Sequence, residues 1–349
     1  MVFQNIENAT AKIAGEHKLI TDYVERFLKA YKHRDKAFFG ELSAFMSLME
    51  KELYNHFSLE ERVFFPAAVH GAKDYDITLM VLNLQKEHGL LETRLSGILK
   101  NKYAIVSGRM ENPLVKTIAD FLKDLGSHAE MEMRDLFPAM DENIRCKTLM
   151  ERYLSMFSKD EQTAPDISDE KPGTRKAAAD SGNKKESPSQ SLSAYSSVSR
   201  LAGEHKLMAT HVTRFERALR DKDEKFFAEL STFLEFLKKD LHSHFILEEL
   251  SFFPAALNGC FDYDMTMTVL NLQRQHGVFE TELQYIRENK QIISAGWIKN
   301  PVIERIAVFL RALKSHVILE LNQVFPNIGK DDACRNLLIK YLKDMKSRD

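Results

Sequence analysis

The sequence predicts an all-α fold of two tandem up-down-up-down four-helix bundles, each with a short closing helix, joined by a flexible linker. A pattern of histidines and glutamates occurs twice, and each histidine of the second copy lies 188 positions after its partner, as His205 does after His17. Apolar residues recur at helical spacing in four long segments of each copy, without strand-like alternation. The length of 349 residues also suits about two domains.

The four helices predicted in the first copy span residues 8–32, 36–70, 76–101 and 112–140. Charged residues 33–35 form the first break, and glycine and proline interrupt the helical pattern at 66–74 and 107–113. The second copy breaks at equivalent places, around residues 221–223, 254–262 and 296–301. A shorter amphipathic stretch closes each copy, at 146–157 and 334–345. Short connections between long helices favour antiparallel neighbours, so each copy is predicted to be a bundle.

The predicted domains are residues 1–158 and 196–349, with residues 159–195 as the linker. The segment 158–194 contains no aromatic residue and is rich in Ser, Lys, Asp, Glu, Pro and Gly. Such a composition cannot bury enough apolar surface to offset the entropy lost on ordering. We therefore expect this segment to be flexible.

Composition excludes several classes of partner. Lys and Arg number 49 against 51 Asp and Glu, a formal charge of −2, so no global field attracts nucleic acid or anionic lipid. The first residues do not resemble a signal peptide, and no run of about 18 apolar residues occurs. Three cysteines, an odd number without a CxxC motif, argue against a disulfide framework. We expect a cytoplasmic protein that binds neither nucleic acid nor membranes.

Each copy carries one histidine on its first helix and a His-x3-Glu pair on each of the next three. Because positions i, i+3, i+4 and i+7 share one face of a helix, these residues lie on the apolar stripes that face the core. Buried histidines and glutamates are costly without a partner, and a metal centre supplies one. The candidate ligands are His17, His56, Glu60, His88, Glu92, His128 and Glu132 in the first copy, and His205, His244, Glu248, His276, Glu280, His316 and Glu320 in the second.

Four histidines and three glutamates exceed the needs of one tetrahedral zinc ion. A ligand set without thiolates suits iron, manganese or zinc, and this one fits two ions bridged by carboxylates. The alternative for each single residue is a core histidine with an ordinary partner, or a His-Glu pair on a helix surface. The remaining histidines, which lack a counterpart in the other copy, are expected at the surface: His33, His70, His211 and His242.

Several neighbours of the pattern are given structural interpretations. Glu61 and Glu249 point about 100 degrees away from the preceding glutamate, so they either orient a ligand or face solvent, and we favour solvent. Phe64, Phe65 and Pro66 are interpreted as core packing and the end of a helix. The equivalent Cys146 and Cys334 are interpreted as buried structural residues.

The segments GEHKLI, NHFSLEERVFFP, KEHGLLETRL and SHAEMEMRDLFP resemble the signature segments of the hemerythrin-like, or HHE cation-binding, family. The second copy repeats them as GEHKLM, SHFILEELSFFP, RQHGVFETEL and SHVILELNQVFP. This resemblance implies a four-helix bundle around a non-haem di-iron centre, two irons per bundle with an oxo or hydroxo bridge. It implies that the four histidines of each copy are terminal ligands, and that the bridging carboxylates are Glu60 and Glu132 in the first copy and Glu248 and Glu320 in the second.

The chain departs from the oxygen-carrying hemerythrins on the third helix. Those proteins have His-x3-His there, whereas this chain has Glu92 and Glu280 in the second position. If these glutamates bind iron they favour its ferric state, which disfavours reversible oxygen carriage; a surface or supporting role is the alternative. The resemblance implies a protein that binds or senses a small molecule such as oxygen, nitric oxide or peroxide, or iron itself. Alternatives are a di-iron enzyme acting on peroxide or nitric oxide, an iron donor for repair, and a metal-free or zinc-filled bundle.

Overall fold

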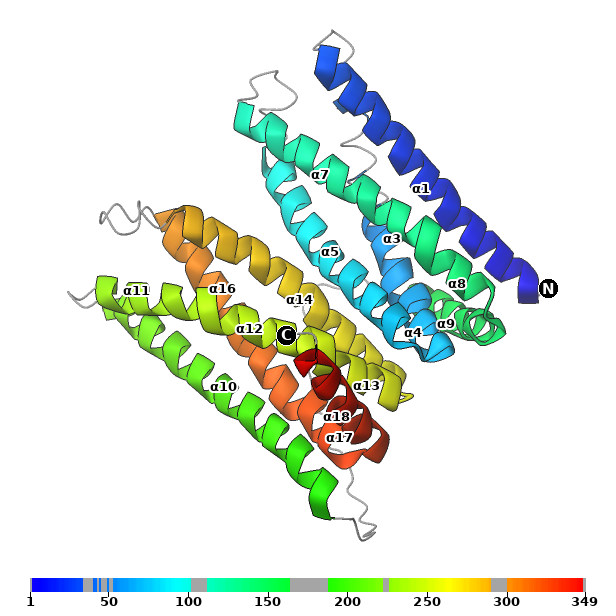
Figure 1. The fold of residues 1–349 in the computed structure, drawn as a ribbon. Coiled ribbons are helices and arrows are strands. Elements are labelled where there is room, and N and C mark those ends of the chain that lie inside the picture. Colours follow the sequence, from blue (N-terminus) through cyan, green and yellow to red (C-terminus); the bar gives the residue numbers. More distant parts are fainter. Residues whose placement is uncertain are drawn as a thin grey trace.

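The computed structural model describes residues 2–33, 40–42, 44, 49, 53–101, 112–163, 188–221, 226–289 and 300–347. Within these ranges the elements are α-helices and π-helices, and no strand occurs (Figure 1). The predicted all-α fold is therefore confirmed. None of the described helices combines the length and apolar character needed to cross a membrane.

Bundle 1 is formed by residues 2–163. Its first helix is α1 (Val2–His33), and its second is described as α3 (Tyr54–Leu59), the π-helix η2 (Glu60–Phe64) and α4 (Phe65–Ala72). The third is α5 (Tyr75–Lys100), and the fourth runs through α7 (Asn112–Met131), η3 (Glu132–Leu136) and α8 (Phe137–Asp141). The closing helix α9 (Ile144–Thr163) is longer than the predicted stretch.

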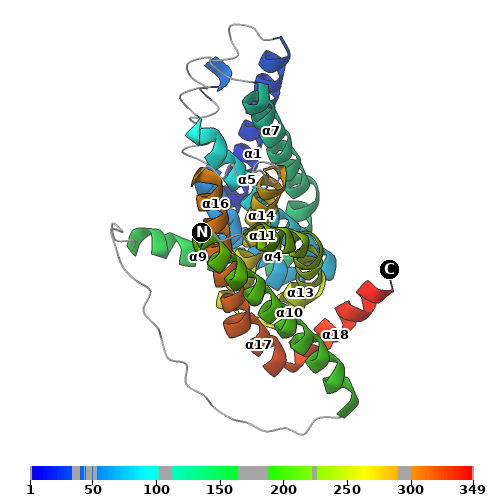
Figure 2. The same ribbon diagram turned by 90° about the vertical axis from the view of Figure 1, so that its left-hand side faces the viewer.

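Bundle 2, residues 188–347, repeats this order. It contains α10 (Pro188–Asp221), then α11 (Phe226–Phe236), η4 (Leu237–Leu241), α12 (His242–Leu247), η5 (Glu248–Phe252) and α13 (Phe253–Gly259). These are followed by α14 (Tyr263–Glu288), then α16 (Asn300–Leu319), η6 (Glu320–Val324) and α17 (Phe325–Lys330), and last α18 (Asp332–Lys346). The closing helices α9 and α18 lie on opposite sides of the molecule (Figure 2).

The predicted linker lies largely outside the described residues. Residues 159–163 of that segment continue α9, and residues 188–195 begin α10, so both helices extend further than the sequence predicts. Residues 164–187 are not described.

An aspartate begins the third helix of each bundle. The Asp74 carboxylate accepts hydrogen bonds from the backbone N–H groups of Asp76 and Ile77 at the start of α5. Asp262 does the same for Met265 at the start of α14. Side-chain acceptors at this position satisfy N–H groups that have no partner within a helix. These caps determine where the helices that carry His88 and His276 begin.

Proline does not end the second and fourth helices. Pro66 was expected to terminate its helix, but it lies near the start of α4 and the helix continues to Ala72. The preceding π-helix η2 changes the hydrogen-bond spacing from four residues to five, so the N–H that proline lacks need not break the helix. Pro138, Pro254 and Pro326 occupy the same place after η3, η5 and η6.

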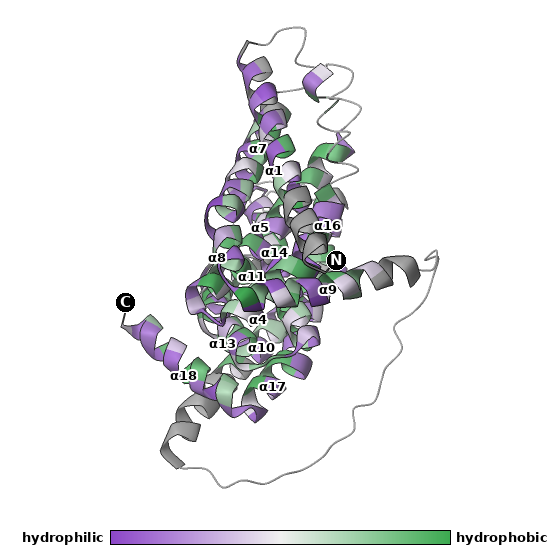
Figure 3. Cartoon of the chain, turned by 90° about the vertical axis from the view of Figure 1, so that its right-hand side faces the viewer, coloured by the Kyte–Doolittle hydropathy of each residue, from purple (hydrophilic) through white to green (hydrophobic). Residues whose placement is uncertain are grey.

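The two bundles share part of their hydrophobic core. One cluster of buried residues joins Phe65 and Val81 of bundle 1 to Phe253 and Val269 of bundle 2. Two further clusters fill the separate ends of bundles 2 and 1. Figure 3 shows hydrophobic residues in the middle of the molecule and hydrophilic residues along outer helices such as α7. The bundles therefore bury apolar surface against each other as well as within themselves.

Helices α5 and α14 form the centre of this interface. They cross with their N-terminal ends on the same side, because His70 just before α5 contacts Thr266 of α14, and Asn258 just before α14 contacts Thr78 of α5. At the crossing, Gly89 lies against the backbone of Arg274 and Gly277 lies against the backbone of Lys86. A Cβ atom at either glycine would fall on a backbone carbonyl oxygen of the opposite helix. Glycine permits this approach because it has no side chain.

Candidate metal centres

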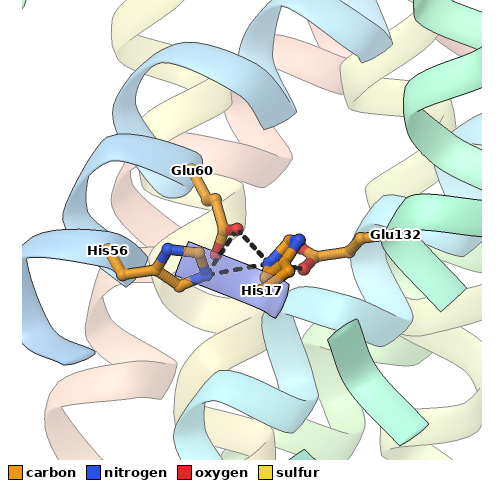
Figure 4. Close-up of side chains that lie close together, drawn as sticks. All are labelled: His17, His56, Glu60 and Glu132. Carbon is orange, nitrogen blue, oxygen red and sulfur yellow. Dashed lines mark hydrogen bonds and ion pairs between the residues drawn. The ribbon is translucent and has the colours of Figure 1, made fainter. Parts of the chain in front are cut away.

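In each bundle, six of the predicted ligands meet at the middle of the helices. His17 comes from α1 and His56 from α3, while Glu60 and Glu132 begin the π-helices η2 and η3 (Figure 4). All are at most 4% exposed. The five-residue π-helices begin at the glutamates, and such local widening is frequent at functional sites. Together with His88 and His128 they form what we call centre 1.

The first half of centre 1 is a compact set of nitrogen and oxygen atoms. The Nε2 atoms of His17 and His56 lie 2.9 Å apart. His56 Nε2 is 2.9 Å from Oε1 of Glu60, and His17 Nε2 is 3.0 Å from Oε2 of Glu132. Two donors bound at right angles to one transition-metal ion, each about 2.1 Å from it, lie about 3.0 Å apart. The spacing of these atoms therefore suits a single ion.

The second half of centre 1 uses the other oxygen of each glutamate. The Nε2 atoms of His88 and His128 are 3.1 Å apart. Oε2 of Glu60 lies 3.3 Å from His88 Nε2, and Oε1 of Glu132 lies 3.5 Å from His128 Nε2. Each carboxylate thus directs one oxygen to each histidine pair. That is the arrangement required of a carboxylate that bridges two ions.

Centre 2 repeats this geometry. Oε1 of Glu248 is 2.9 Å from His244 Nε2, and its Oε2 is 3.4 Å from His276 Nε2. Oε2 of Glu320 is 3.0 Å from His205 Nε2, and its Oε1 is 3.2 Å from His316 Nε2. The ligand atoms of each half lie within 4.8 Å of one another, so each bundle offers two groups that could hold an ion and that share both glutamates.

A further residue accepts a hydrogen bond from the outer nitrogen of most of these histidines. In centre 1, His56 Nδ1 lies 2.7 Å from Glu16, His128 Nδ1 lies 2.8 Å from Glu87, and His88 Nδ1 lies 2.9 Å from Glu61. A proton on Nδ1 leaves the Nε2 lone pair free to bind a metal. The equivalent acceptors in centre 2 are Glu204, Gln275 and Glu249.

These contacts correct the interpretation of Glu61 and Glu249. Glu61 and Glu249 were expected to face solvent, but their side chains are 13% and 17% exposed and hold His88 and His276. The position of Glu61 directly after a ligand does not reveal this contact in the sequence, because only the packing of two helices brings Glu61 to His88. The replacement of Glu87 by Gln275 in the second copy retains an acceptor for the histidine, which agrees with a supporting role.

The charges within each centre stabilise one another. Burial acts to raise the pKa of Glu60, but its histidine neighbours, His56 foremost, lower it well below the ordinary value. Burial acts to lower the pKa of His56, yet Glu60 and Glu16 raise it to about 10. A metal ion binds the deprotonated nitrogen, so its binding must displace protons from these histidines.

The buried carboxylates have polar atoms that ordinary protein contacts do not satisfy. Both oxygens of Glu60 and both of Glu132 lack a hydrogen bond of good geometry, although histidine nitrogens lie close by. The same holds for Glu248 and Glu320. Unsatisfied buried carboxylates are expensive. Four imidazole nitrogens and four carboxylate oxygens around one point fit a pair of metal ions that prefer nitrogen and oxygen donors.

Glu92 and Glu280, which were also predicted to bind the metal, lie apart from the other six candidate ligands of their bundles. Neither residue belongs to the groups of converging ligand atoms found among the described residues. Oε2 of Glu92 is 2.9 Å from Nη2 of Arg274, and Oε1 of Glu280 is 2.6 Å from Nζ of Lys86. Each glutamate therefore forms an ion pair with the opposite bundle. The i to i+4 spacing places them on the same side of the helix as the histidine, but the neighbouring bundle determines their partner.

The histidines outside the pattern differ in environment. His70 was expected at the surface but is 2% exposed, and its ring nitrogens lie 2.6 Å from Tyr153 Oη and 2.7 Å from Thr266 Oγ1 of bundle 2. His242 is exposed and His211 stacks on Phe236. The side chain of His33 lies outside the described residues.

The two equivalent cysteines are buried, as expected. Cys146 and Cys334 are each 1% exposed, and they pack where Gly71 and Gly259 leave room on the neighbouring helices. Burial raises the pKa of the Cys146 thiol to about 11 and that of Cys334 to about 12. Both are therefore thiols at neutral pH with no sign of reactive character.

Comparison with known proteins gives one family. Residues 8–140 and 196–328 each match the family model described as the hemerythrin HHE cation binding domain. The two matched segments contain the histidines and glutamates of centre 1 and centre 2. No curated protein and no solved structure matches the chain.

Proposed function

Because the chain belongs to the hemerythrin HHE cation binding domain family, we propose that each of its bundles holds two iron ions and binds or senses a small molecule with them. The single observation that carries this proposal is the sharing of both glutamates by the two histidine pairs of each centre. One carboxylate oxygen directed to each pair supports two bridged ions rather than one. The four groups correspond to four ions per chain.

The donor set suits iron better than calcium, magnesium or a single structural zinc ion. Each group offers two imidazole nitrogens and two carboxylate oxygens, without a thiolate. Calcium and magnesium prefer sites made only of oxygen, and a structural zinc site is closed by four ligands without a shared carboxylate. Iron in the midst of bundled helices uses glutamate and histidine ligands of this kind.

The number of donors leaves room for a small molecule. Four protein donors per ion are fewer than the six of an octahedral metal, so each ion retains positions for a bridging group and a ligand from solution. In bundle 2, a pocket of about 220 Å³ has His244 and Glu204 in its wall. This pocket supports access of a molecule of diatomic or peroxide size to the edge of centre 2.

A di-iron enzyme that decomposes peroxide or reduces nitric oxide is the second candidate. The observation that favours it is the placement of Glu92 against Arg274, where oxygen-carrying hemerythrins have a fifth histidine. Without that ligand, both ions of a centre have equal donor sets and open positions. The same openness would suit an iron donor for repair of damaged iron centres.

A reducing, cytoplasmic location is part of this proposal. Cys146, Cys260 and Cys334 are all free thiols, and Cys146 and Cys334 are buried. Proteins of oxidising compartments more often pair their cysteines.

Metal analysis of the purified full-length chain tests the proposal. We expect about four irons per chain, one for each group, together with visible absorption bands of an oxo-bridged or hydroxo-bridged pair. Anaerobic reduction followed by oxygen, nitric oxide or hydrogen peroxide should change these bands, and steady consumption of peroxide or nitric oxide would favour the enzyme. A chain that takes up zinc but no iron under iron-replete conditions would refute the di-iron proposal.

A further inference from the structure

Two cations reach across the interface between the bundles. Arg274 belongs to α14 of bundle 2, yet its Nη1 is 3.4 Å from Oε2 of Glu61 in bundle 1. Lys86 belongs to α5 of bundle 1, yet its Nζ is 3.1 Å from Oε1 of Glu249 in bundle 2. The Lys86 side chain is only 17% exposed. The two contacts are reciprocal, because Lys86 and Arg274 occupy equivalent positions in the two copies.

The carboxylates that receive these cations also hold ligand histidines. The Oε1 atom of Glu61 lies 2.9 Å from His88 Nδ1, and that of Glu249 lies 2.8 Å from His276 Nδ1. Both histidines are fully buried, with Nε2 directed to their centre. A line of direct contacts therefore leads from Arg274 of bundle 2 to centre 1. An equivalent line leads from Lys86 of bundle 1 to centre 2.

Tyrosines of each bundle also contact the ligand-bearing π-helix of the other. The Tyr75 hydroxyl donates a 2.7 Å hydrogen bond to the carbonyl of Leu250 in η5. The Tyr263 hydroxyl donates a 2.8 Å bond to the carbonyl of Arg62 in η2. These carbonyls directly follow Glu249 and Glu61 in the chain. The backbone that carries the supporting carboxylates is thus held from the opposite bundle.

We propose that each bundle completes the metal centre of the other, with Arg274 and Lys86 as positioning residues. Arg274 holds the outer oxygen of Glu61, so that its inner oxygen keeps His88 in the orientation that presents Nε2 to centre 1. Lys86 contacts both oxygens of Glu249, and so holds the carboxylate whose Oε1 keeps His276 directed to centre 2. This inference rests on the metal binding proposed above, and it makes the tandem chain, rather than one bundle, the functional unit.

The electrostatic consequence has a definite sign. Without Arg274, the charge of Glu61 is no longer balanced from outside, so its hydrogen bond makes His88 a stronger electron donor. A more electron-rich ligand stabilises ferric over ferrous iron, which lowers the reduction potential. The substitution is made in bundle 2, whereas the lower reduction potential is expected in centre 1 of bundle 1. Simple adhesion between the bundles would not produce such a crosswise effect.

The test compares Arg274→Gln and Lys86→Gln in the full chain, with each centre measured alone. Centre 1 is isolated by Glu248→Ala with Glu320→Ala, and centre 2 by Glu60→Ala with Glu132→Ala. We expect Arg274→Gln to weaken ferrous iron binding by centre 1 about tenfold, as loss of a group behind a metal-bound histidine does, and to lower its reduction potential. Centre 2 should remain unchanged. Lys86→Gln should give the reverse pattern, and Arg274→Lys should restore most of the affinity of centre 1.

Arg305→Gln is the matched control. Arg305 is 37% exposed, as Arg274 is, and it forms an ion pair with Glu282 inside bundle 2. Its loss should leave the affinity and potential of both centres unchanged. Equal weakening of both centres by Arg274→Gln and by Lys86→Gln would show that the cations only hold the bundles together, and would overturn the inference. So would an Arg274→Gln chain whose affinity and potential match those of the wild type.

A second measurement requires no deleted centre. Release of ferrous iron from the otherwise unaltered chain to a chelator should become about ten times faster for half of the iron in Arg274→Gln, and for all of it in Arg274→Gln with Lys86→Gln. Uniform release from the single variant at the wild-type rate would contradict the proposal. Failure of the wild-type chain to bind any iron is a different outcome, because it refutes the proposed function and removes this inference with it.

Discussion

Replacement of His70 by asparagine is expected to remove a pH dependence of stability that arises at the interface of the bundles. Burial lowers the pKa of His70 to about 4 from an ordinary value of 6.5, although Asp262 opposes this shift. The equivalent residue of bundle 2 is Asn258, whose side chain lies 2.9 Å from Thr78 and donates to Tyr341. Asparagine can therefore make the equivalent contacts without a titrating ring. His70→Asn is thus a conservative change with a natural precedent in the same chain.

The size of the effect follows from the two pKa values. Between pH 6.5 and about 4 the unfolded chain protonates this histidine while the folded chain keeps it neutral. The contribution of neutral His70 to the free energy of unfolding is therefore fully present above pH 6.5, and it falls as the pH is lowered through this window. At about 1.4 kcal/mol per pH unit, the total is about 3 kcal/mol, of which about 2 kcal/mol is lost by pH 5.

Urea unfolding of the metal-free protein at pH 7.5 and pH 5 measures the loss of the free energy of unfolding between these pH values. Every other titrating group is shared by the two proteins, so their contributions cancel in the difference. We expect the wild type to lose about 2 kcal/mol more than His70→Asn between the two pH values. Asn258→His should add a pH dependence of the same sign. If the wild type and His70→Asn lose stability in parallel, the imidazole ionises in the folded protein and our account of its burial is wrong.

Three further predictions concern the centre and the interface. Glu60→Ala should remove about half of the iron of the chain, because both halves of centre 1 share this carboxylate. Metal analysis tests this, with Glu130→Ala, a change at an exposed residue, as the control. Full retention of iron in Glu60→Ala would exclude Glu60 as a bridging ligand. Glu92→Gln should leave the iron content unchanged, since this carboxylate faces Arg274. Loss of iron from bundle 1 in this variant would show that Glu92 is a metal ligand. Gly89→Ala should destabilise the chain by about 2 kcal/mol, as overpacking commonly does, because its methyl group falls on a carbonyl of α14. Gly97→Ala on the same helix, with open space around it, should instead stabilise by about 0.5–1 kcal/mol; equal urea midpoints for the two variants would contradict the close crossing.

The sequence by itself determined the helical bundles and the residues that converge in each centre. His17, His56, His88 and His128 lie on the apolar stripes of their helices, and this periodicity is enough to direct them to a common core. The repeat at a constant spacing made the second centre as predictable as the first. Such features are local or periodic, so they can be recognised without knowledge of how the bundles pack.

The tertiary structure alone decided the partners of Glu92, Glu280, Glu61 and Glu249. A glutamate four residues after a histidine has the same spacing whether it faces a metal or a neighbouring bundle, and here Arg274 lies across the interface. Pro66 continues its helix for a similar reason, because a π-helix begins at Glu60 where the chain folds around the centre. His70 is buried because residues nearly two hundred positions away cover it. Contacts between distant segments depend on which surfaces meet, and helical periodicity carries no information about that choice.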